Sequence, residues 1–285
     1  MKLLNPATPP HTVSASRLKA VILDWAGTTV DFGSLAPART LQTVFAGVGI
    51  ALTEAETRED MGLAKRTHIR NLLKMARVAE QWRTVHGAAP GEMDAERMYA
   101  EFIPLQFSCL EEYSNVIEGI PEAMEMFRLR GLGVGSTTGY TREMLDVLVA
   151  LAAKQGYSPE CSLTPGEVGL GRPYPFMIYE NAVRLGVYPM AAIAKVGDTP
   201  SDIQEGLNAG TWAIGVAGTG NGIGLSKSEF EALAPAERET RLAAARAELA
   251  AAGAHFVVDA VTEVFPVLDR IDELLSGATP DGMRA

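Results

Sequence analysis

Residues 19–29 read KAVILDWAGTT, an apolar run that ends at one carboxylate, Asp24, and continues into a glycine-containing turn. A short continuous apolar run with turn residues after it is typical of a strand buried on both faces of a parallel sheet. Similar runs follow at residues 132–137, 193–197, 211–216 and 255–258. The sequence therefore predicts a sheet whose first strand ends at an acid.

Helical patterns separate these apolar runs. They occupy residues 119–130, 141–154, 174–185 and 201–209. Strands that alternate with helices of this length are typical of βαβ units, in which successive parallel strands are joined by a crossover helix. We therefore predict an α/β fold with a Rossmann-like, doubly wound parallel sheet.

The alternation is interrupted once, between residues 37 and 112, where only helical patterns occur. One of them runs over residues 64–87, and another begins at a predicted capping box formed by Thr53 and Glu56. We therefore predict a helical cap at residues 35–112, inserted into an α/β core of residues 1–34 and 113–285. Because the chain leaves and re-enters the same sheet, the two linkers should lie close together and act as a hinge.

Composition limits the classes of partner. The chain has 285 residues and a formal net charge of −10, which argues against nucleic acid or an anionic membrane as the main partner and favours a small molecule.

The two cysteines lack metal-site spacing, so a reducing cytoplasm is expected. Residues 1–16 lack the apolar core of a signal peptide, and the uncharged residues 207–226 are too rich in glycine for a membrane helix. Residues 226–252 are predicted to form a charged surface helix.

Polar residues follow three of the predicted strands. Asp24, Thr138 and Asp198 each come at a strand end, and Asp202 lies four residues after Asp198. Each has a simpler interpretation as a helix cap, a first-turn acid or a turn residue. Carboxyl ends of parallel strands meet at one edge of the sheet, however, so together these groups predict a Mg²⁺ site beside a phosphoryl group.

These residues form a set that resembles a known superfamily. Asp24-x-x-Gly27-Thr28, the Thr-ended second strand, the basic residue of GRPYP and the acids of GDTPSD resemble, in that order, the four motifs of the haloacid dehalogenase-like superfamily. Within it, DWAGTTVDFGSLAP, MGLAKRTH, GSTTGYTREM, GRPYP and KVGDTPSD are similar to the phosphonoacetaldehyde hydrolase family. The resemblance implies an α/β core, an inserted helical cap, bound Mg²⁺ and a homodimer through the caps.

One position departs from the phosphatases of the superfamily. They carry a second Asp, two residues after the nucleophile, as the general acid for the departing alkoxide. Here that position is Ala26, whose methyl group donates no proton. A phosphonate has a carbon leaving group, which needs an electron sink rather than an acid.

Lys65, within MGLAKRTH, is predicted to supply the sink by forming an imine with an aldehyde substrate. The alternative is a solvated lysine on a helix. Because an ordinary lysine has a pKa of about 10.4, the site must lower the pKa of Lys65 by roughly 3 units. His68, three residues further on, is either a proton relay for imine formation or a packing histidine.

By the same resemblance, Asp24 attacks phosphorus and forms an aspartyl phosphate. Asp24, the backbone carbonyl of Ala26 and Asp198 are expected to hold Mg²⁺, with Asp202 acting on the ion from outside this set or through water.

Thr138 and Arg172 are expected to bind the phosphonate oxygens, with Lys195 as a weaker alternative to the arginine. Met61 and Gly62 are expected to shape the pocket on the cap side. Together these roles predict Mg²⁺-dependent cleavage of the carbon–phosphorus bond of phosphonoacetaldehyde. A 2-haloacid dehalogenase and a non-catalytic phosphonate sensor remain the alternatives.

Overall fold

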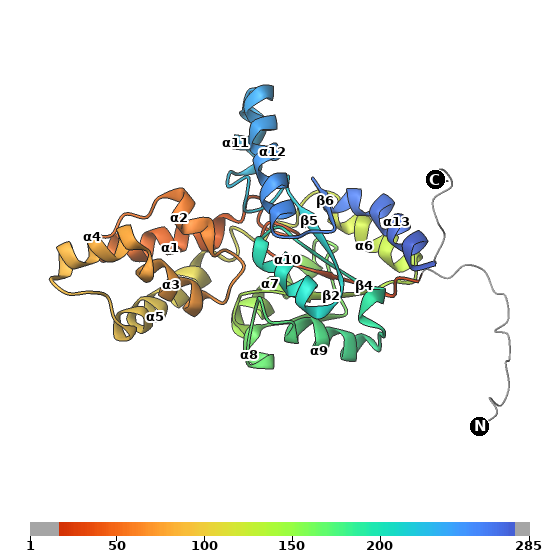
Figure 1. The fold of residues 1–285 in the computed structure, drawn as a ribbon, viewed down its shortest axis with the longest axis horizontal. Helices are drawn as coiled ribbons and strands as arrows, with labels where there is room; N and C mark the ends of the chain where they lie inside the picture. The colour runs from red at the N-terminus through yellow and green to blue at the C-terminus, as the bar shows by residue number, and fades with distance from the viewer. Residues whose placement is uncertain (1–16, 277–285) are drawn as a thin grey trace, which may run out of the picture.

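The computed structural model describes residues 17–276, so the predicted lead-in at residues 1–16 lies outside the described residues. A parallel sheet in the order β3-β2-β1-β4-β5-β6 forms the centre of the molecule (Figure 1). The predicted α/β, doubly wound fold is confirmed. The strands are β1 (Ala20–Leu23), β2 (Gly133–Thr137), β3 (Cys161–Leu163), β4 (Ile193–Gly197), β5 (Trp212–Val216) and β6 (Phe256–Val258).

Strand β1 is central because it pairs with β2 on one side and β4 on the other. Its side chains alternate between two buried clusters, with Val21 and Leu23 in one and Ala20 and Ile22 in the other. This is why the run is apolar throughout. One face packs against α9 (Phe176–Leu185), α10 (Pro200–Ala209) and α12 (Pro235–Ala251), and the other against α6 (Ile120–Leu129), α7 (Arg142–Ala153) and α13 (Val264–Ser276).

The residues between β1 and α6 form a group of helices beside the sheet (Figure 1). Among the described residues, no strand interrupts these helices, as predicted. The entering and leaving linkers are adjacent: Val30 and Val116 form an antiparallel bridge, and the Ile117 amide donates to the Thr29 carbonyl at 2.9 Å. The helices are α1 (Leu35–Gly47), α2 (Glu54–Glu59), α3 (Lys65–Lys74), α4 (Ala76–His86) and α5 (Glu92–Cys109).

Two predicted helices are each split. The helix predicted over residues 64–87 breaks at Met75, whose ψ of 133° is extended, so that α3 and α4 pack separately. The helix predicted over residues 226–252 breaks before Pro235, because a residue that precedes proline is pushed out of the helical region. This separates α11 (Lys227–Ala232) from α12.

Three short or terminal elements were not predicted. Strand β3 has three residues and lies at the sheet edge, and α8 (Pro165–Val168) has four, so neither is long enough to show a periodicity. Helix α13 was also not predicted.

The predicted capping box of α2 is present: the Thr53 hydroxyl accepts from the Glu56 amide, and the Glu56 carboxylate accepts from the Thr53 amide. Two 3₁₀ turns, η1 (Met190–Ala192) and η2 (Val261–Glu263), precede β4 and α13.

Within residues 17–276, no helix combines the length and the apolar character needed to cross a membrane.

Candidate active site

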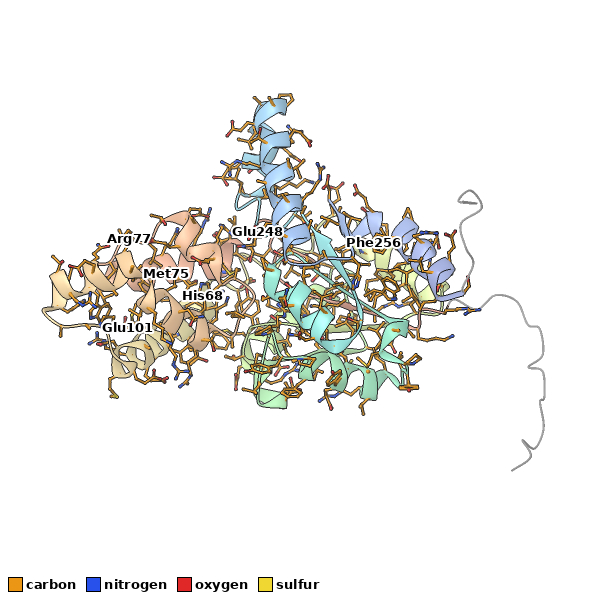
Figure 2. All side chains as sticks on the ribbon, viewed as in Figure 1. His68, Met75, Arg77, Glu101, Glu248 and Phe256 are labelled. Atoms are coloured by element: carbon orange, nitrogen blue, oxygen red, sulfur yellow. The ribbon has the colours of Figure 1, made fainter. Side chains whose placement is uncertain are left out.

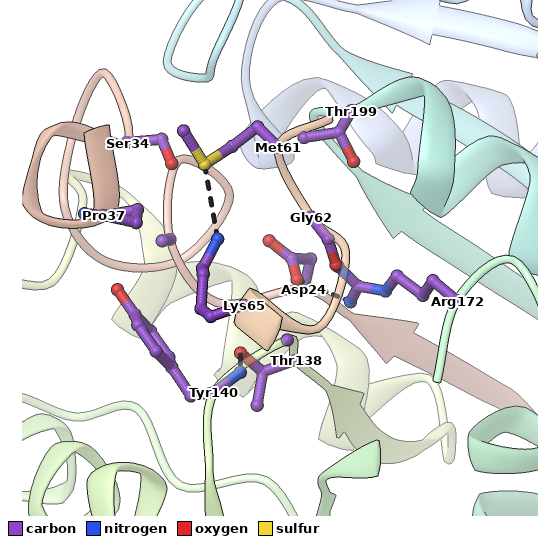
Figure 3. Close-up of a pocket in the computed structure, with 12 residues that line it drawn as sticks. Asp24, Ser34, Pro37, Met61, Gly62, Lys65, Thr138, Tyr140, Arg172 and Thr199 are labelled. Atoms are coloured by element: carbon purple, nitrogen blue, oxygen red, sulfur yellow. Dashed lines mark hydrogen bonds and ion pairs between the residues drawn. The ribbon is translucent and has the colours of Figure 1, made fainter. Parts of the chain in front are cut away.

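The carboxyl ends of the central strands meet the helical segment at a small cavity (Figure 3). Its volume is about 20 Å³, little more than one water molecule needs. The edge of the sheet contributes Asp24 and Thr138 to this cavity, and the segment before α3 contributes Met61 and Gly62. The lining residues are Asp24, Ala26, Ser34, Pro37, Met61, Gly62, Lys65, Thr138, Gly139, Tyr140, Arg172 and Thr199.

Three of the predicted site residues, His68, Asp198 and Asp202, are not among the lining residues. The other seven are brought together, although they come from segments up to 148 residues apart in the sequence, as between Asp24 and Arg172.

Arg172 is buried against Asp24. Its Nη2 donates to Asp24 Oδ1 at 2.6 Å and to the Thr137 carbonyl at 2.9 Å, and its Nε donates to Glu205 Oε2 at 3.0 Å. Charge-assisted bonds of this kind are stronger than neutral ones. Burial raises the pKa of Asp24, although the charge of Arg172 opposes that shift. Two predicted site residues, Asp24 and Arg172, are therefore in direct contact in the fold.

Asp24, Asp198 and Asp202 form a buried cluster in which one ligand oxygen of each lies within 4.8 Å of the others. Asp198 accepts hydrogen bonds from the Thr28 hydroxyl at 3.0 Å and the Asn221 amide at 2.7 Å, and no salt bridge to it occurs within residues 17–276. Burial and the charges of Asp24 and Asp202 raise the pKa of Asp198 well above the ordinary value. Mg²⁺ binds oxygen ligands, and it would offset the charge of Asp198, which lies beside two further carboxylates.

Asp202 differs from Asp198 because cations lie against it. Lys195 Nζ is 2.8 Å and Arg172 Nη2 is 3.0 Å from Asp202 Oδ1. Burial acts to raise the pKa of Asp202, but these two charges outweigh it and hold the pKa below its usual value. Asp202 also belongs to the capping box of α10, where its carboxylate accepts from the Thr199 amide at 3.3 Å and from the Thr199 hydroxyl at 2.5 Å. It therefore has both the first-turn role and the proximity to the acid cluster that the sequence suggested.

Lys65 begins α3 and is buried, with only 7% of its surface exposed. Figure 3 shows its side chain in the cavity, where Nζ donates to the sulfur of Met61 at 3.5 Å. A thioether is a weak acceptor, so this contact compensates the buried charge poorly. Burial and, to a smaller extent, the charge of Arg172 lower the pKa of Lys65 to about 8, although Asp24 and Asp198 act in the opposite direction.

His68 lies one turn further along α3, within the helical segment (Figure 2). It is fully buried, and the backbone of Thr57 is a polar group that lies against its ring. Burial and the charge of Lys65 lower its pKa well below the ordinary value. The residue is thus neutral and near Lys65, and its role in proton relay stays a prediction.

The segment before α3 contacts the core closely. The Ser201 hydroxyl donates to the Met61 carbonyl at 3.1 Å, and a Cβ on Gly62 would lie 2.2 Å from Ser201 Oγ. On the other side, a Cβ on Gly139 would lie 2.6 Å from the Leu63 carbonyl oxygen. Only glycine leaves room for the Ser201 side chain at position 62 and for the facing backbone at position 139.

Several known proteins are similar to this chain in sequence. The model of the haloacid dehalogenase-like hydrolases matches residues 18–210. A phosphonoacetaldehyde hydrolase of Bacillus cereus is 44% identical over 257 residues, which cover 90% of this chain and 97% of the relative. Another, from Nitratidesulfovibrio vulgaris, is 44% identical over 264 residues, 92% of this chain and 94% of the relative. The chain belongs to the phosphonoacetaldehyde hydrolase family of the haloacid dehalogenase-like hydrolases.

Solved structures agree with this membership. A phosphonoacetaldehyde hydrolase-like protein from Oleispira antarctica superposes with a TM-score of 0.90 at 37% identity, covering 95% of this chain and 99% of that one. A β-phosphoglucomutase from Clostridium difficile superposes with a TM-score of 0.64 at 16% identity, covering 91% of this chain and 99% of that one. The second likeness shows only that the fold is shared.

This haloacid dehalogenase-like hydrolase also contains site residues that sequence reasoning missed. Ser34, Pro37 and Tyr140 line the cavity, and all three lie in stretches that carried the resemblance. Glu205 contacts Arg172 from α10. Glu205 lies three residues after Asp202 on a predicted helix, and residues three apart share a helix face. This spacing could have predicted that Glu205 lies near the site.

Proposed function

We propose that this hydrolase cleaves the carbon–phosphorus bond of phosphonoacetaldehyde to give acetaldehyde and phosphate. The relatives at 44% identity are named for that reaction. The observation that carries the proposal is the buried amine of Lys65, with its pKa lowered to about 8, in the same cavity as Asp24 and Arg172. An amine, a carboxylate and a guanidinium together match an aldehyde that bears a phosphonate.

The first proposed step takes place at Lys65. The neutral amine adds to the aldehyde carbon, and loss of water gives a protonated imine. Because the pKa of Lys65 is lowered to about 8, deprotonation at neutral pH costs much less free energy than it does for an ordinary lysine. Neutral His68 is available to pass a proton during the loss of water.

The second proposed step takes place at Asp24. Its carboxylate oxygen attacks phosphorus, the carbon–phosphorus bond breaks, and its electron pair moves to the imine to give an enamine. Water then hydrolyses the aspartyl phosphate to phosphate, while protonation and hydrolysis of the enamine release acetaldehyde and restore Lys65. No general acid is needed at Ala26, because the imine and not a proton accepts the electrons.

Arg172 and Thr138 are proposed to bind the phosphonate. Arg172 lies within hydrogen-bond distance of Asp24, so it holds the nucleophile and the phosphonate in one charged contact. The Thr138 hydroxyl lines the same cavity and accepts from the Tyr140 amide at 3.2 Å, which leaves its own proton for a phosphonate oxygen. Met61 and Gly62 would close the pocket opposite these groups.

Asp24, Asp198 and the carbonyl of Ala26 are the groups proposed to hold Mg²⁺, with Asp202 acting through water. When bound, the ion would offset the negative charges of the carboxylates and the phosphonate. This proposal is supported by the burial of Asp198 beside two further carboxylates, with no salt bridge to a cation within the described residues to offset its charge.

Residues 35–112 are proposed to act as a cap that opens for each substrate. A cavity of about 20 Å³ is too small for a molecule that carries a phosphonate group, so the contacts at Gly62 and Gly139 must separate to admit it. Homodimerisation through this cap and a cytoplasmic location stay predictions.

The two alternatives are disfavoured by particular groups. A 2-haloacid dehalogenase has no use for a buried amine or for an acid cluster that needs a cation. A non-catalytic sensor has no use for an amine whose pKa is lowered to about 8.

The test is release of products by the purified protein. With Mg²⁺, we expect equal amounts of acetaldehyde and phosphate from phosphonoacetaldehyde, and loss of both with a chelator. In the variant Lys65→Arg, which keeps the charge but forms no imine, we expect activity to fall by a factor of at least about 10³ with an unchanged circular dichroism spectrum. Normal turnover by Lys65→Arg would exclude the imine mechanism, and turnover of 2-haloacids alone would favour the dehalogenase.

A further inference from the structure

Behind the candidate site lies a buried group of polar residues to which the proposed reaction gives no role. Lys195 on β4 and Glu205 on α10 are fully buried, and the hydroxyl of Thr137, at the end of β2, lies between them. Burying charged groups costs free energy unless they are paired. The hydrogen bonds and ion pairs of Lys195, Glu205 and Thr137 therefore indicate which neighbouring group these residues hold in place.

The contacts converge on Arg172. Glu205 Oε2 accepts from Arg172 Nε at 3.0 Å and from Thr137 Oγ1 at 3.0 Å, and Lys195 Nζ lies 3.4 Å from the same oxygen. Thr137 Oγ1 in turn accepts from Arg172 Nη2 at 2.8 Å and from Lys195 Nζ at 2.9 Å. Glu205 and Thr137 thus hold two adjacent nitrogens of the guanidinium.

These bonds fix the plane of the guanidinium, which carries five N–H donors in a rigid arrangement. Nε donates to Glu205, and Nη2 lies against Asp24, Thr137 and Asp202. Within residues 17–276, Nη1 has one contact, a long one of 3.4 Å to the Gly62 carbonyl. Nη1 is therefore the nitrogen with donor capacity to spare beside the cap.

We propose that Glu205 is a positioning residue for phosphoryl recognition: it holds Nε of Arg172 so that Nη1 faces the cavity and binds an oxygen of phosphate or a phosphonate. Lys195 balances the charges of Glu205 and Asp202 at the same point. Glu205 itself touches neither the substrate nor the reacting atoms. The inference rests on the proposed function in one respect, the assignment of Arg172 to the phosphonate.

The test uses Glu205→Gln in the full chain, a change that keeps the size of the side chain and removes its charge. We expect the dissociation constant of inorganic phosphate, measured by titration calorimetry with Mg²⁺, to rise by at least about tenfold, because a charged hydrogen bond to Arg172 is lost. Lys65 lies outside this group of contacts. Borohydride should therefore still trap acetaldehyde on Lys65 in the variant, which a general loss of structure would not allow.

Asn181→Ala is the matched control. Asn181 is fully buried on α9 and donates to the carbonyls of Ser136 at 3.1 Å and Met177 at 2.9 Å, without contacting Arg172. We expect this variant to have a lower melting temperature and parental phosphate affinity. If Glu205→Gln does not fold, the double variant Lys195→Met/Glu205→Gln removes both charges and carries the same test.

The outcomes separate this proposal from the proposed function. Phosphate affinity within about twofold of the parent in the Glu205 variant, or no phosphate binding by the parent, would overturn the positioning role. Weakened phosphate binding in the Glu205 variant supports it, even if the parent does not hydrolyse phosphonoacetaldehyde, in which case only the proposed reaction fails.

Discussion

Lys65 illustrates how the same residue acquires different chemistry from its surroundings. Without the family resemblance, the sequence around it favours a solvated lysine on a helix. In the fold it is buried, and its amine meets the thioether of Met61 rather than a carboxylate. Burial disfavours the charged form, which is why its pKa falls to about 8.

The lowered pKa predicts the pH dependence of imine formation. Only the neutral amine attacks the aldehyde, so the rate should rise roughly tenfold per pH unit below about 8 and level off above it. The measurement is the rate at which borohydride traps acetaldehyde on Lys65, followed by mass spectrometry between about pH 6 and about pH 10. A rate that continues to rise to about pH 10 would indicate an ordinary lysine.

Met61 offers a control for the cause of this shift. If burial and not the thioether contact lowers the pKa of Lys65, Met61→Leu should leave the midpoint near 8, because leucine is a similarly sized apolar group. A midpoint that moves by more than about one unit would assign the shift to the sulfur.

At the scale of elements, the segment that joins α2 to α3 is held against the core by backbone contacts. The turn after β2 has glycine at position 139, where a Cβ would lie 2.6 Å from the carbonyl oxygen of Leu63. Backbone atoms at that distance must move apart. The close approach of the helical segment to the turn after β2 therefore depends on Gly139, which belongs to neither the carboxylate cluster nor the amine.

Gly139→Ala should accordingly hold the cap away from the core. We expect kcat/KM for phosphonoacetaldehyde to fall by roughly 10- to 100-fold, since a displacement of about 1 Å at a reacting centre has an effect of that size. The melting temperature should change little, because the substitution affects one contact and leaves the hydrophobic cluster shared by the sheet and the helical segment in place. Steady-state kinetics and thermal unfolding measure the two effects.

Gly47→Ala provides the comparison for this variant. Gly47 ends α1, and a Cβ there meets no atom within 4 Å, so alanine should leave kcat/KM unchanged and stabilise the helix slightly. Equal kinetics for the two variants would show that the Gly139 contact does not control closure.

At the scale of the whole molecule, the sheet order places β1 between β2 and β4, so three strand ends meet at one edge. Asp24, Asp198 and Asp202 gather there, and Asp198 has no salt bridge within the described residues to offset its burial. A divalent cation bound to the folded chain and not to the unfolded chain stabilises it by mass action.

We therefore expect saturating Mg²⁺ to raise the melting temperature by about 5 °C and a chelator to reverse the shift without unfolding the protein. Asp198→Asn should abolish the shift. Asp146→Asn should retain it, because Asp146 lies on the surface of α7, paired with Arg142. An equal shift in all three proteins would place the ion elsewhere.

Much of the architecture follows from the sequence by itself, because it is encoded in local patterns. The buried strands, the helical insertion and the strand-end positions of Asp24, Thr138 and Asp198 follow from apolar runs and the turns after them. The break at Met75 and the three-residue β3 do not, since packing against other elements and not periodicity decides them.

Only the tertiary structure decided the chemistry of the site. The contact of Arg172 with Asp24, the pairing of Glu205 with both Arg172 and Lys195, and the burial of Lys65 join residues far apart in the chain. Charge pairing and pKa depend on distance and on exclusion of water, which the sequence around each residue does not specify. The sequence thus determined which groups are available. The order of the strands, with the helices packed on them, brought Asp24, Arg172, Lys195 and Glu205 together, and the packing of the helical segment on the sheet added Lys65.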